Sequence, residues 1–168
     1  AVLSRSGLVQ MNRTGACLLG GKFNLLSLGF ADRLITSDAD PVSLLQGTIN
    51  LVQPGHLELS DYGHIQDSLS ILRPYLRYAA ESGQRGVNVL LYGPPGTGKS
   101  QLARVLAKEL GCELFEVASE DEDGDPINGE HRLRAFRAGQ FFFAQRRALN
   151  AFDEIEDADC IFIIGSNT

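Results

Sequence analysis

Apolar residues recur with helical spacing just before the middle of the chain. Five of them are separated by steps of four and three residues, which places them on one face of a helix. These positions are Ile65, Leu69, Leu72, Leu76 and Ala79. Pro74 lies inside the pattern, so the helix either kinks there or begins again at that residue.

Short apolar runs of strand length alternate with helical patterns in the second half of the chain. The expected strands are residues 87–92, 113–118, 148–152 and 160–164. Leu102, Val105, Leu106 and Leu110 mark an amphipathic helix, which Gly111 should end as a C-terminal cap. This alternation of strands and helices predicts an α/β fold in three layers, αβα, with a parallel sheet.

A further helix is expected over residues 131–147. Its pattern predicts that the apolar side chains face inward and that the arginines mostly face outward. The inward set is Leu133, Phe136, Phe141 and Ala144, and the outward set is Arg132, Arg134, Arg137, Arg146 and Arg147.

Residues 1–60 differ from the rest because glycine repeatedly interrupts their apolar runs. The pattern suggests a few short strands or helical turns and does not choose between them. Asp40-Pro41 reads as the start of a short helix with Pro41 near its first position. We therefore expect a small accessory region at 1–60 and a main domain at 61–168.

Composition fits a globular chain. The sequence has 168 residues, of which 43% are hydrophobic, and this is enough for a buried core. Cys17, Cys112 and Cys160 are few and widely spaced, which predicts reduced structural thiols instead of disulfides or a metal cluster. No apolar run approaches the roughly 20 residues of a membrane span, so we expect a cytoplasmic protein without a membrane partner.

The net charge of −6 is concentrated in two clusters. One lies within residues 120–125 and the other within residues 153–159. Outside them Lys and Arg outnumber the acids, so the net charge argues neither for nor against a nucleic-acid partner.

The run Gly93–Ser100, here called the glycine-rich loop, matches the pattern G-x-x-x-x-G-K-[ST] between an expected strand and an expected helix. Its glycines let successive N–H groups turn toward phosphate oxygens, Lys99 can reach the β- and γ-phosphates, and the Ser100 hydroxyl can bind Mg²⁺. The pattern predicts ATP and Mg²⁺ as cofactors. The expected nucleotide-binding residues are Gly93, Pro94, Pro95, Gly96, Thr97, Gly98, Lys99, Ser100 and Gln101.

Acidic residues follow the expected strand 148–152. Asp153 is the candidate for a second Mg²⁺ ligand, and Glu154 is the candidate base that polarises the attacking water. A solvated acidic turn is the alternative interpretation. Asn150 and Ala151 also make this strand less apolar than a buried central strand usually is.

These motifs, in this order, resemble those of the AAA+ ATPases. The glycine-rich loop is similar to Walker A, the run 153–157 to Walker B, and the strand before Ser166-Asn167 to the sensor 1 element. The resemblance covers about residues 60–168. It implies that Asn167 helps to position the lytic water, and that the turn formed by Asp61, Tyr62 and Gly63 contacts the adenine.

The resemblance also implies a homo-oligomeric ring, expected to be a hexamer, that acts on a protein or other macromolecule. Gly129-Glu130, followed by Arg134 and Phe136, is similar to the stretch behind the pore loop of the AAA subfamily. Ile127-Asn128 stands where that subfamily has an aromatic residue, so threading of a polypeptide is not expected. The acidic run 120–125 lacks the glycine position of an EF-hand and is either a solvated loop or a partner-facing one.

The distance from Asp153 to Asn167 is short for the expected topology. About seven residues join the two strands, whereas parallel neighbours need a crossover of a dozen or more. Either a segment near residues 157–159 is missing from the sequence, which we favour, or the strand assignment is wrong. The family's arginine finger, second sensor and helical lid would lie after Thr168.

Two other functions remain open. A P-loop small-molecule kinase would need an acceptor pocket and a cationic lid, for which the arginines of 131–147 are the candidates. A non-catalytic module would use ATP as a regulatory ligand only. The leading interpretation is an ATPase that couples hydrolysis to remodelling of a macromolecular partner.

Overall fold

The computed structural model describes residues 5–12, 22–36, 40–84, 86–121, 123–143, 146, 148–152 and 160–164. The chain divides into two compact units, each made from two segments. Residues 1–50 and 117–142 form the first unit, and residues 51–116 and 143–168 form the second. The division after residue 60 expected from the sequence stays a prediction.

The first unit combines short strands with helices. Strands β1 (Val9–Met11) and β2 (Phe23–Leu25) pair antiparallel, with Gln10 opposite Asn24. The helices are α2 (Leu28–Thr36), α3 (Pro41–Leu45) and α6 (Gly129–Phe142). Helix α3 begins at Pro41, as predicted, because its fixed φ suits a first helical turn that has no need of its N–H.

The second unit contains the helices and strands around the glycine-rich loop. They are η2 (Leu59–Ile65), α4 (Gln66–Ser82), β4 (Val87–Leu91), α5 (Lys99–Leu110), β5 (Glu113–Val117), β6 (Ala148–Phe152) and β7 (Cys160–Ile164). All of them were predicted except η2, and β5 ends at the first residue of the other unit. Helix α4 runs through Pro74 without a break. Gly111 ends α5 with a φ of 63°, which confirms the predicted C-terminal cap.

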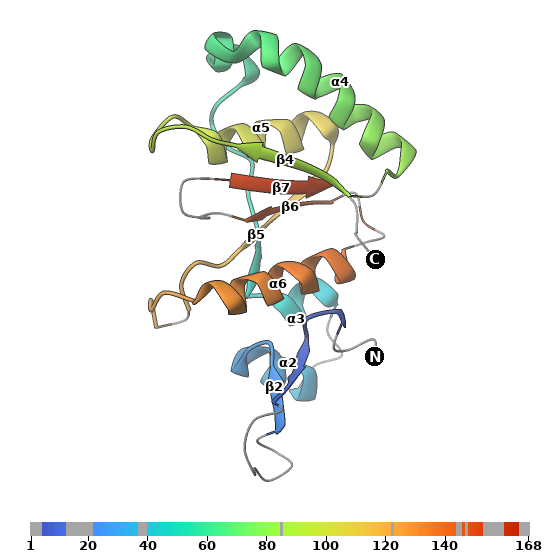
Figure 1. The fold of residues 1–168 in the computed structure, drawn as a ribbon, viewed down its shortest axis with the longest axis vertical. Coiled ribbons are helices and arrows are strands. Elements are labelled where there is room, and N and C mark those ends of the chain that lie inside the picture. The colour runs from blue at the N-terminus through green and yellow to red at the C-terminus, as the bar shows by residue number, and fades with distance from the viewer. Residues whose placement is uncertain are drawn as a thin grey trace. The chain divides into compact units, whose positions relative to one another are not determined.

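The sheet is mixed, and this corrects the predicted parallel sheet (Figure 1). Its strand order is β3-β5-β6-β7-β4, where β3 (Ile49–Leu51) spans the boundary between the units. Strands β5 and β6 are parallel, but β7 runs antiparallel to both of its neighbours. The reason is the short connection: seven residues between β6 and β7 suffice for a reversal but not for a crossover. Both strand assignments therefore hold, and the direction of β7 was predicted wrongly.

The register places the ends of β4 and β6 at one edge of the sheet. Ile161 of β7 pairs with Leu90 on one side and with Phe152 on the other. Strands β4 and β6 are therefore parallel to each other and two strand spacings apart, or about 10 Å. The glycine-rich loop follows β4, so it leaves the sheet at the edge where β6 ends.

A hydrophobic core holds α4 and α5 against one face of this sheet (Figure 1). It includes Leu69 and Leu76 of α4, Leu106 of α5 and Leu149 of β6, each at most 1% exposed. All five residues of β6 are buried, so Asn150 and Ala151 do not prevent a central position. The α/β character is confirmed, whereas the predicted third layer is not.

Helix α6 presents a different face from the predicted one. Leu133 and Phe141 are exposed, while Arg132 and Arg134 are buried. The Arg134 guanidinium donates to the carbonyl oxygens of Gly7 and Asn24, at 3.4 and 2.9 Å, which offsets part of the cost of its burial. Its Nη1 has no hydrogen-bond partner among the described residues. Burial also lowers its pKa. The prediction was wrong for these four residues because it took charge as a sign of exposure, whereas Arg137 and Arg146 are exposed as predicted.

Among the described residues, none of the helices combines the length and apolar character that a bilayer crossing requires.

Candidate functional site

The glycine-rich loop has the backbone conformation that its sequence predicts. Gly93, Gly96 and Gly98 have φ angles of 144°, 80° and 83°. A side chain at these angles would strain the backbone, so glycine at these positions permits the turn. Between them, the Thr97 hydroxyl donates to the carbonyl of Pro94 at 2.9 Å and closes the loop on itself.

Helix α5 begins directly from this loop. Its N-cap is Gly98, and no side chain caps the first turn in this part of the described structure. The first N–H groups of a helix have no intrahelical acceptor and carry a partial positive charge. In α5 they are available to an anion seated in the loop, which is the arrangement used by phosphate-binding helices.

The Lys99 ammonium lies over the loop. Its Nζ donates to the carbonyl oxygens of Gly93 and Pro94, at 2.8 and 2.7 Å, and lies 3.3 Å from the Thr97 hydroxyl. These three acceptors are neutral. An anionic phosphate oxygen would form a stronger, charge-assisted hydrogen bond with the same ammonium. The loop therefore fits a phosphate group by its shape and by its charge.

Ser100 and Gln101 occupy the first turn of α5 and are half-buried. The Gln101 side-chain oxygen is buried and has no hydrogen-bond partner among the described residues. It packs against Gly55, where an added Cβ would come within 2.1 Å of that oxygen. The structure thus places Gln101 beside the loop, although its side chain faces another segment of the second unit.

Tyr62 is the member of the predicted adenine turn that touches the glycine-rich loop. Its hydroxyl donates to the Gly98 carbonyl at 2.9 Å, and the side chain is buried. Asp61 is exposed and accepts from the Glu58 N–H at 2.8 Å, which caps its own turn. Gly63 is exposed. The turn therefore adjoins the loop as predicted, while its contact with a base stays a prediction.

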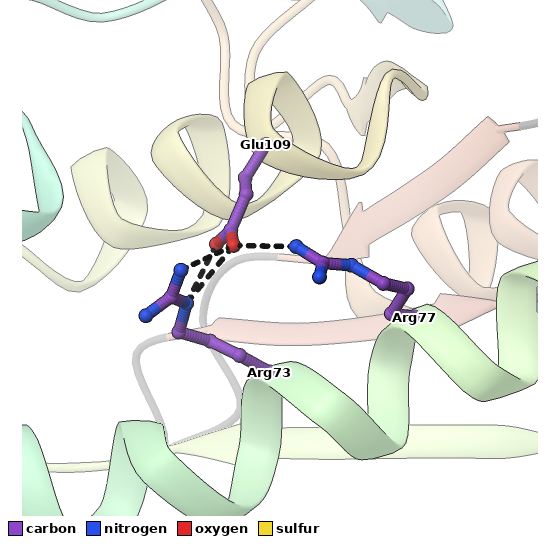
Figure 2. Close-up of polar contacts among 3 residues, drawn as sticks. All are labelled: Arg73, Arg77 and Glu109. Atoms are coloured by element: carbon purple, nitrogen blue, oxygen red, sulfur yellow. Dashed lines mark hydrogen bonds and ion pairs between the residues drawn. The ribbon is translucent and has the colours of Figure 1, made fainter.

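An ion-pair cluster ties α4 to α5, the helix that follows the loop (Figure 2). Arg73 Nε donates to both carboxylate oxygens of Glu109, at 3.0 and 2.9 Å, and Arg77 reaches the same carboxylate at 3.0 Å. These hydrogen bonds, chiefly those from Arg73, lower the pKa of Glu109. The cluster links the C-terminal end of α5 to α4 and adds to the hydrophobic contacts between these helices.

The remaining predicted catalytic residues follow strand ends. Asp153 and Glu154 come directly after Phe152, and they lie outside the described residues, as does Asn167. Strand β6 ends at the same edge of the sheet as β4, where the glycine-rich loop begins. This position is compatible with the predicted roles of Asp153 in binding Mg²⁺ and of Glu154 in polarising water. Strand β7 runs the other way, and its last residue, Ile164, pairs with Val87 at the opposite edge. The role of Asn167 stays a prediction.

The acidic run 120–125 is organised by one of its own carboxylates. Asp121 Oδ1 accepts the N–H groups of Asp123 and Asp125, at 3.0 and 2.9 Å. Within the described part of the chain, no three acidic, His or Cys side chains form a group that could hold a metal ion. After the run, the Asn128 side chain accepts the His131 N–H at 2.9 Å and caps α6.

Sequence reasoning missed two features of this site. The Tyr62 hydroxyl contact joins residues 36 positions apart, and the Arg73–Glu109 pair spans the same separation. Neither has a local signal, because each depends on how α4 and η2 pack on α5. Only the position of the turn was found, through the family resemblance.

Comparisons with known proteins give one family model and several similar proteins. Residues 89–165 match the model of the ATPase family associated with various cellular activities, AAA. The mouse ATPase family gene 2 protein homolog B is 37% identical over 114 residues, which are 64% of this chain and 15% of that protein. No solved structure gives a significant match.

Two other relatives come from microbes. The replication factor C large subunit of Nanoarchaeum equitans is 35% identical over 99 residues, 58% of this chain and 22% of the relative. The ATP-dependent zinc metalloprotease FtsH 1 of Symbiobacterium thermophilum is 31% identical over 102 residues, 59% of this chain and 17% of the relative. The chain thus spans less than a quarter of the length of each of these relatives.

Proposed function

We propose that this chain binds ATP and hydrolyses it with Mg²⁺, because residues 89–165 match the model of the AAA ATPase family that the motifs resemble. The observation that carries the proposal is the glycine-rich loop. It combines three glycines with positive φ, the uncapped start of α5, and a lysine ammonium over the loop. This combination favours a polyphosphate over other anions, since it offers several donors along one curved backbone.

The glycine-rich loop and the two acids after β6 have separate roles in this proposal. Backbone N–H groups of residues 96–100 would hold the β- and γ-phosphates, since Pro94 and Pro95 have no N–H. The Lys99 ammonium would donate to phosphate oxygens in place of the loop carbonyls that it contacts now. Ser100 and Asp153 would hold Mg²⁺, which would neutralise phosphate charge when bound. Glu154, one residue farther along, would orient and polarise the attacking water. Both acids follow β6, which ends at the edge of the sheet where the glycine-rich loop begins.

The proposal extends to a ring that remodels a macromolecular partner, expected to be a homohexamer. Its support is family membership, together with the relatives named as a replication factor subunit and an ATP-dependent protease. Native mass spectrometry of the gene-encoded full-length protein, with and without ATP, tests the assembly. A protein that stays monomeric at micromolar concentration with ATP would contradict the ring.

The kinase alternative loses part of its support in the structure. Arg132 and Arg134 were candidates for its cationic lid, but both are buried, and Arg134 donates to backbone carbonyls. A buried guanidinium with such partners is not free to close over a transferred phosphate. Stimulation of ATP consumption by a small acceptor molecule would restore this alternative.

The Glu154→Gln variant tests hydrolysis. Replacing the carboxylate by an amide keeps the shape of the side chain and removes its ability to polarise water. We expect turnover to fall by roughly two to four orders of magnitude while ATP affinity is retained. Glu81→Gln, at an exposed position of α4, is the control and should hydrolyse ATP like the parent. Undiminished hydrolysis by Glu154→Gln would refute its role, and binding without turnover in the parent would favour the regulatory module.

A further inference from the structure

The Tyr62 side chain contacts the glycine-rich loop through its hydroxyl, and this contact can influence the conformation of the loop. The ring is 3% exposed, and the hydroxyl donates to the Gly98 carbonyl at 2.9 Å. Burial and the nearby charge of Asp61 raise the pKa of Tyr62, so the hydroxyl stays protonated and donates at neutral pH. The hydroxyl is therefore available as a donor to the Gly98 carbonyl at neutral pH.

The Gly98 carbonyl lies where the glycine-rich loop joins α5. It accepts two hydrogen bonds, one from Tyr62 and one from the Leu102 N–H at 2.8 Å, which is the first hydrogen bond of α5. The peptide that joins Gly98 to Lys99 is trans and planar, so its N–H points away from its carbonyl. A donor that fixes the Gly98 carbonyl thus also fixes the direction of the Lys99 N–H, on the side facing away from Tyr62.

Packing supports the same arrangement. A Cβ added at Gly98 would lie 3.3 Å from the Tyr62 hydroxyl oxygen and 3.7 Å from its ring, so this ring occupies the space beside the glycine. Gly98 also has a φ of 83°, a conformation that glycine adopts easily and can leave easily. A buried hydroxyl that holds its carbonyl limits that freedom.

We propose that Tyr62 is a positioning residue for phosphate recognition, which holds the Gly98–Lys99 peptide so that the Lys99 N–H faces the polyphosphate. The inference rests on the proposed function, since it names how the same loop is set for its ligand. It gives the Tyr62 side chain a role toward the phosphates in place of the base contact that the family resemblance implies. Loss of the hydroxyl should weaken the binding of any polyphosphate and leave recognition of the nucleoside unchanged.

The test compares Tyr62→Phe with the parent chain and with Tyr75→Phe, a control at a partly exposed position of α4. Isothermal titration calorimetry measures binding of ATP, inorganic tripolyphosphate and adenosine, and circular dichroism measures the thermal midpoint without ligand. We expect the dissociation constants for ATP and tripolyphosphate to rise by a common factor of about 3 to 10. Adenosine binding and the Tyr75→Phe values should stay at the parent level.

Other outcomes are distinguishable. Equal affinity of Tyr62→Phe and the parent for tripolyphosphate would overturn the inference while the proposed ATP binding stands. A weakening for adenosine and ATP alone would overturn it in favour of a base contact. Failure of Tyr62→Phe to fold, or weakening for all three ligands in step with a lower thermal midpoint, would assign the hydroxyl to the fold. Absence of ATP and tripolyphosphate binding by the parent would refute the proposed function itself.

Discussion

Truncation of Leu106 tests the core that supports the glycine-rich loop. Leu106 lies in the middle of α5 and is 1% exposed within the cluster shared by α4, α5 and the sheet. Leu106→Ala removes three carbons, and at roughly 0.8 kcal/mol for each buried carbon the lost transfer free energy is about 2.4 kcal/mol. An unfilled cavity adds on the order of 1 kcal/mol. The free energy of unfolding of the second unit should therefore fall by about 3 to 4 kcal/mol.

Tyrosine fluorescence in a urea titration reads this unit selectively. The chain has no Trp, and its four tyrosines all belong to the second unit. These are Tyr62, Tyr75, Tyr78 and Tyr92. Ile71→Ala is the control, because Ile71 is 75% exposed on α4 and its truncation should change the unfolding free energy by less than about 0.5 kcal/mol. A loss below about 1 kcal/mol for Leu106→Ala, or one equal to the control, would refute the assigned core.

Two further predictions concern the ion-pair cluster and the strand register. Glu109→Gln should destabilise the second unit at pH 7, but less than Leu106→Ala does. The pKa of Glu109 is lowered in the folded state, so the extra unfolding free energy of the parent is fully present above the ordinary value of 4.5. It disappears as the pH falls through the folded pKa. A difference in unfolding free energy between parent and variant that persists at pH 2 in urea titrations would contradict this. Leu91→Cys should form a disulfide with Cys160, its antiparallel partner, whereas Val87→Cys should not. Mass spectrometry of peptides after mild oxidation identifies the cysteines that are joined. A disulfide in Val87→Cys and none in Leu91→Cys would indicate a parallel β7.

Much of the second unit could be predicted because its signals are local. The spacing of apolar residues gave α4 and α5, and the glycines gave the loop, since positive φ angles leave few other choices. The strand limits were also close. Their directions depend on which strands pair and not on any local pattern. The short connection before Cys160 is incompatible with a parallel neighbour, and the antiparallel pairing that accommodates it appears only in the structure.

Buried polar groups show the second limit of sequence reasoning. Arg134 was expected outside because it is charged, but two backbone carbonyls distant in sequence make its burial tolerable. Tyr62 was assigned to a base contact by resemblance, while its hydroxyl binds the Gly98 carbonyl. In both cases the hydrogen-bond partner is a backbone carbonyl that tertiary packing brings close. The residue pattern around Arg134 or Tyr62 does not predict such a partner.

Equilibrium binding of ATP tests the central claim most directly. Calorimetry on this chain should show saturable binding of ATP, and Lys99→Ala should weaken it at least about a hundredfold, because its charge-assisted hydrogen bonds to phosphate are lost. Lys108→Ala, at an exposed position of the same helix, should bind like the parent. Unchanged affinity in Lys99→Ala, or equal losses in both variants, would contradict phosphate binding by the loop from Gly93 to Ser100.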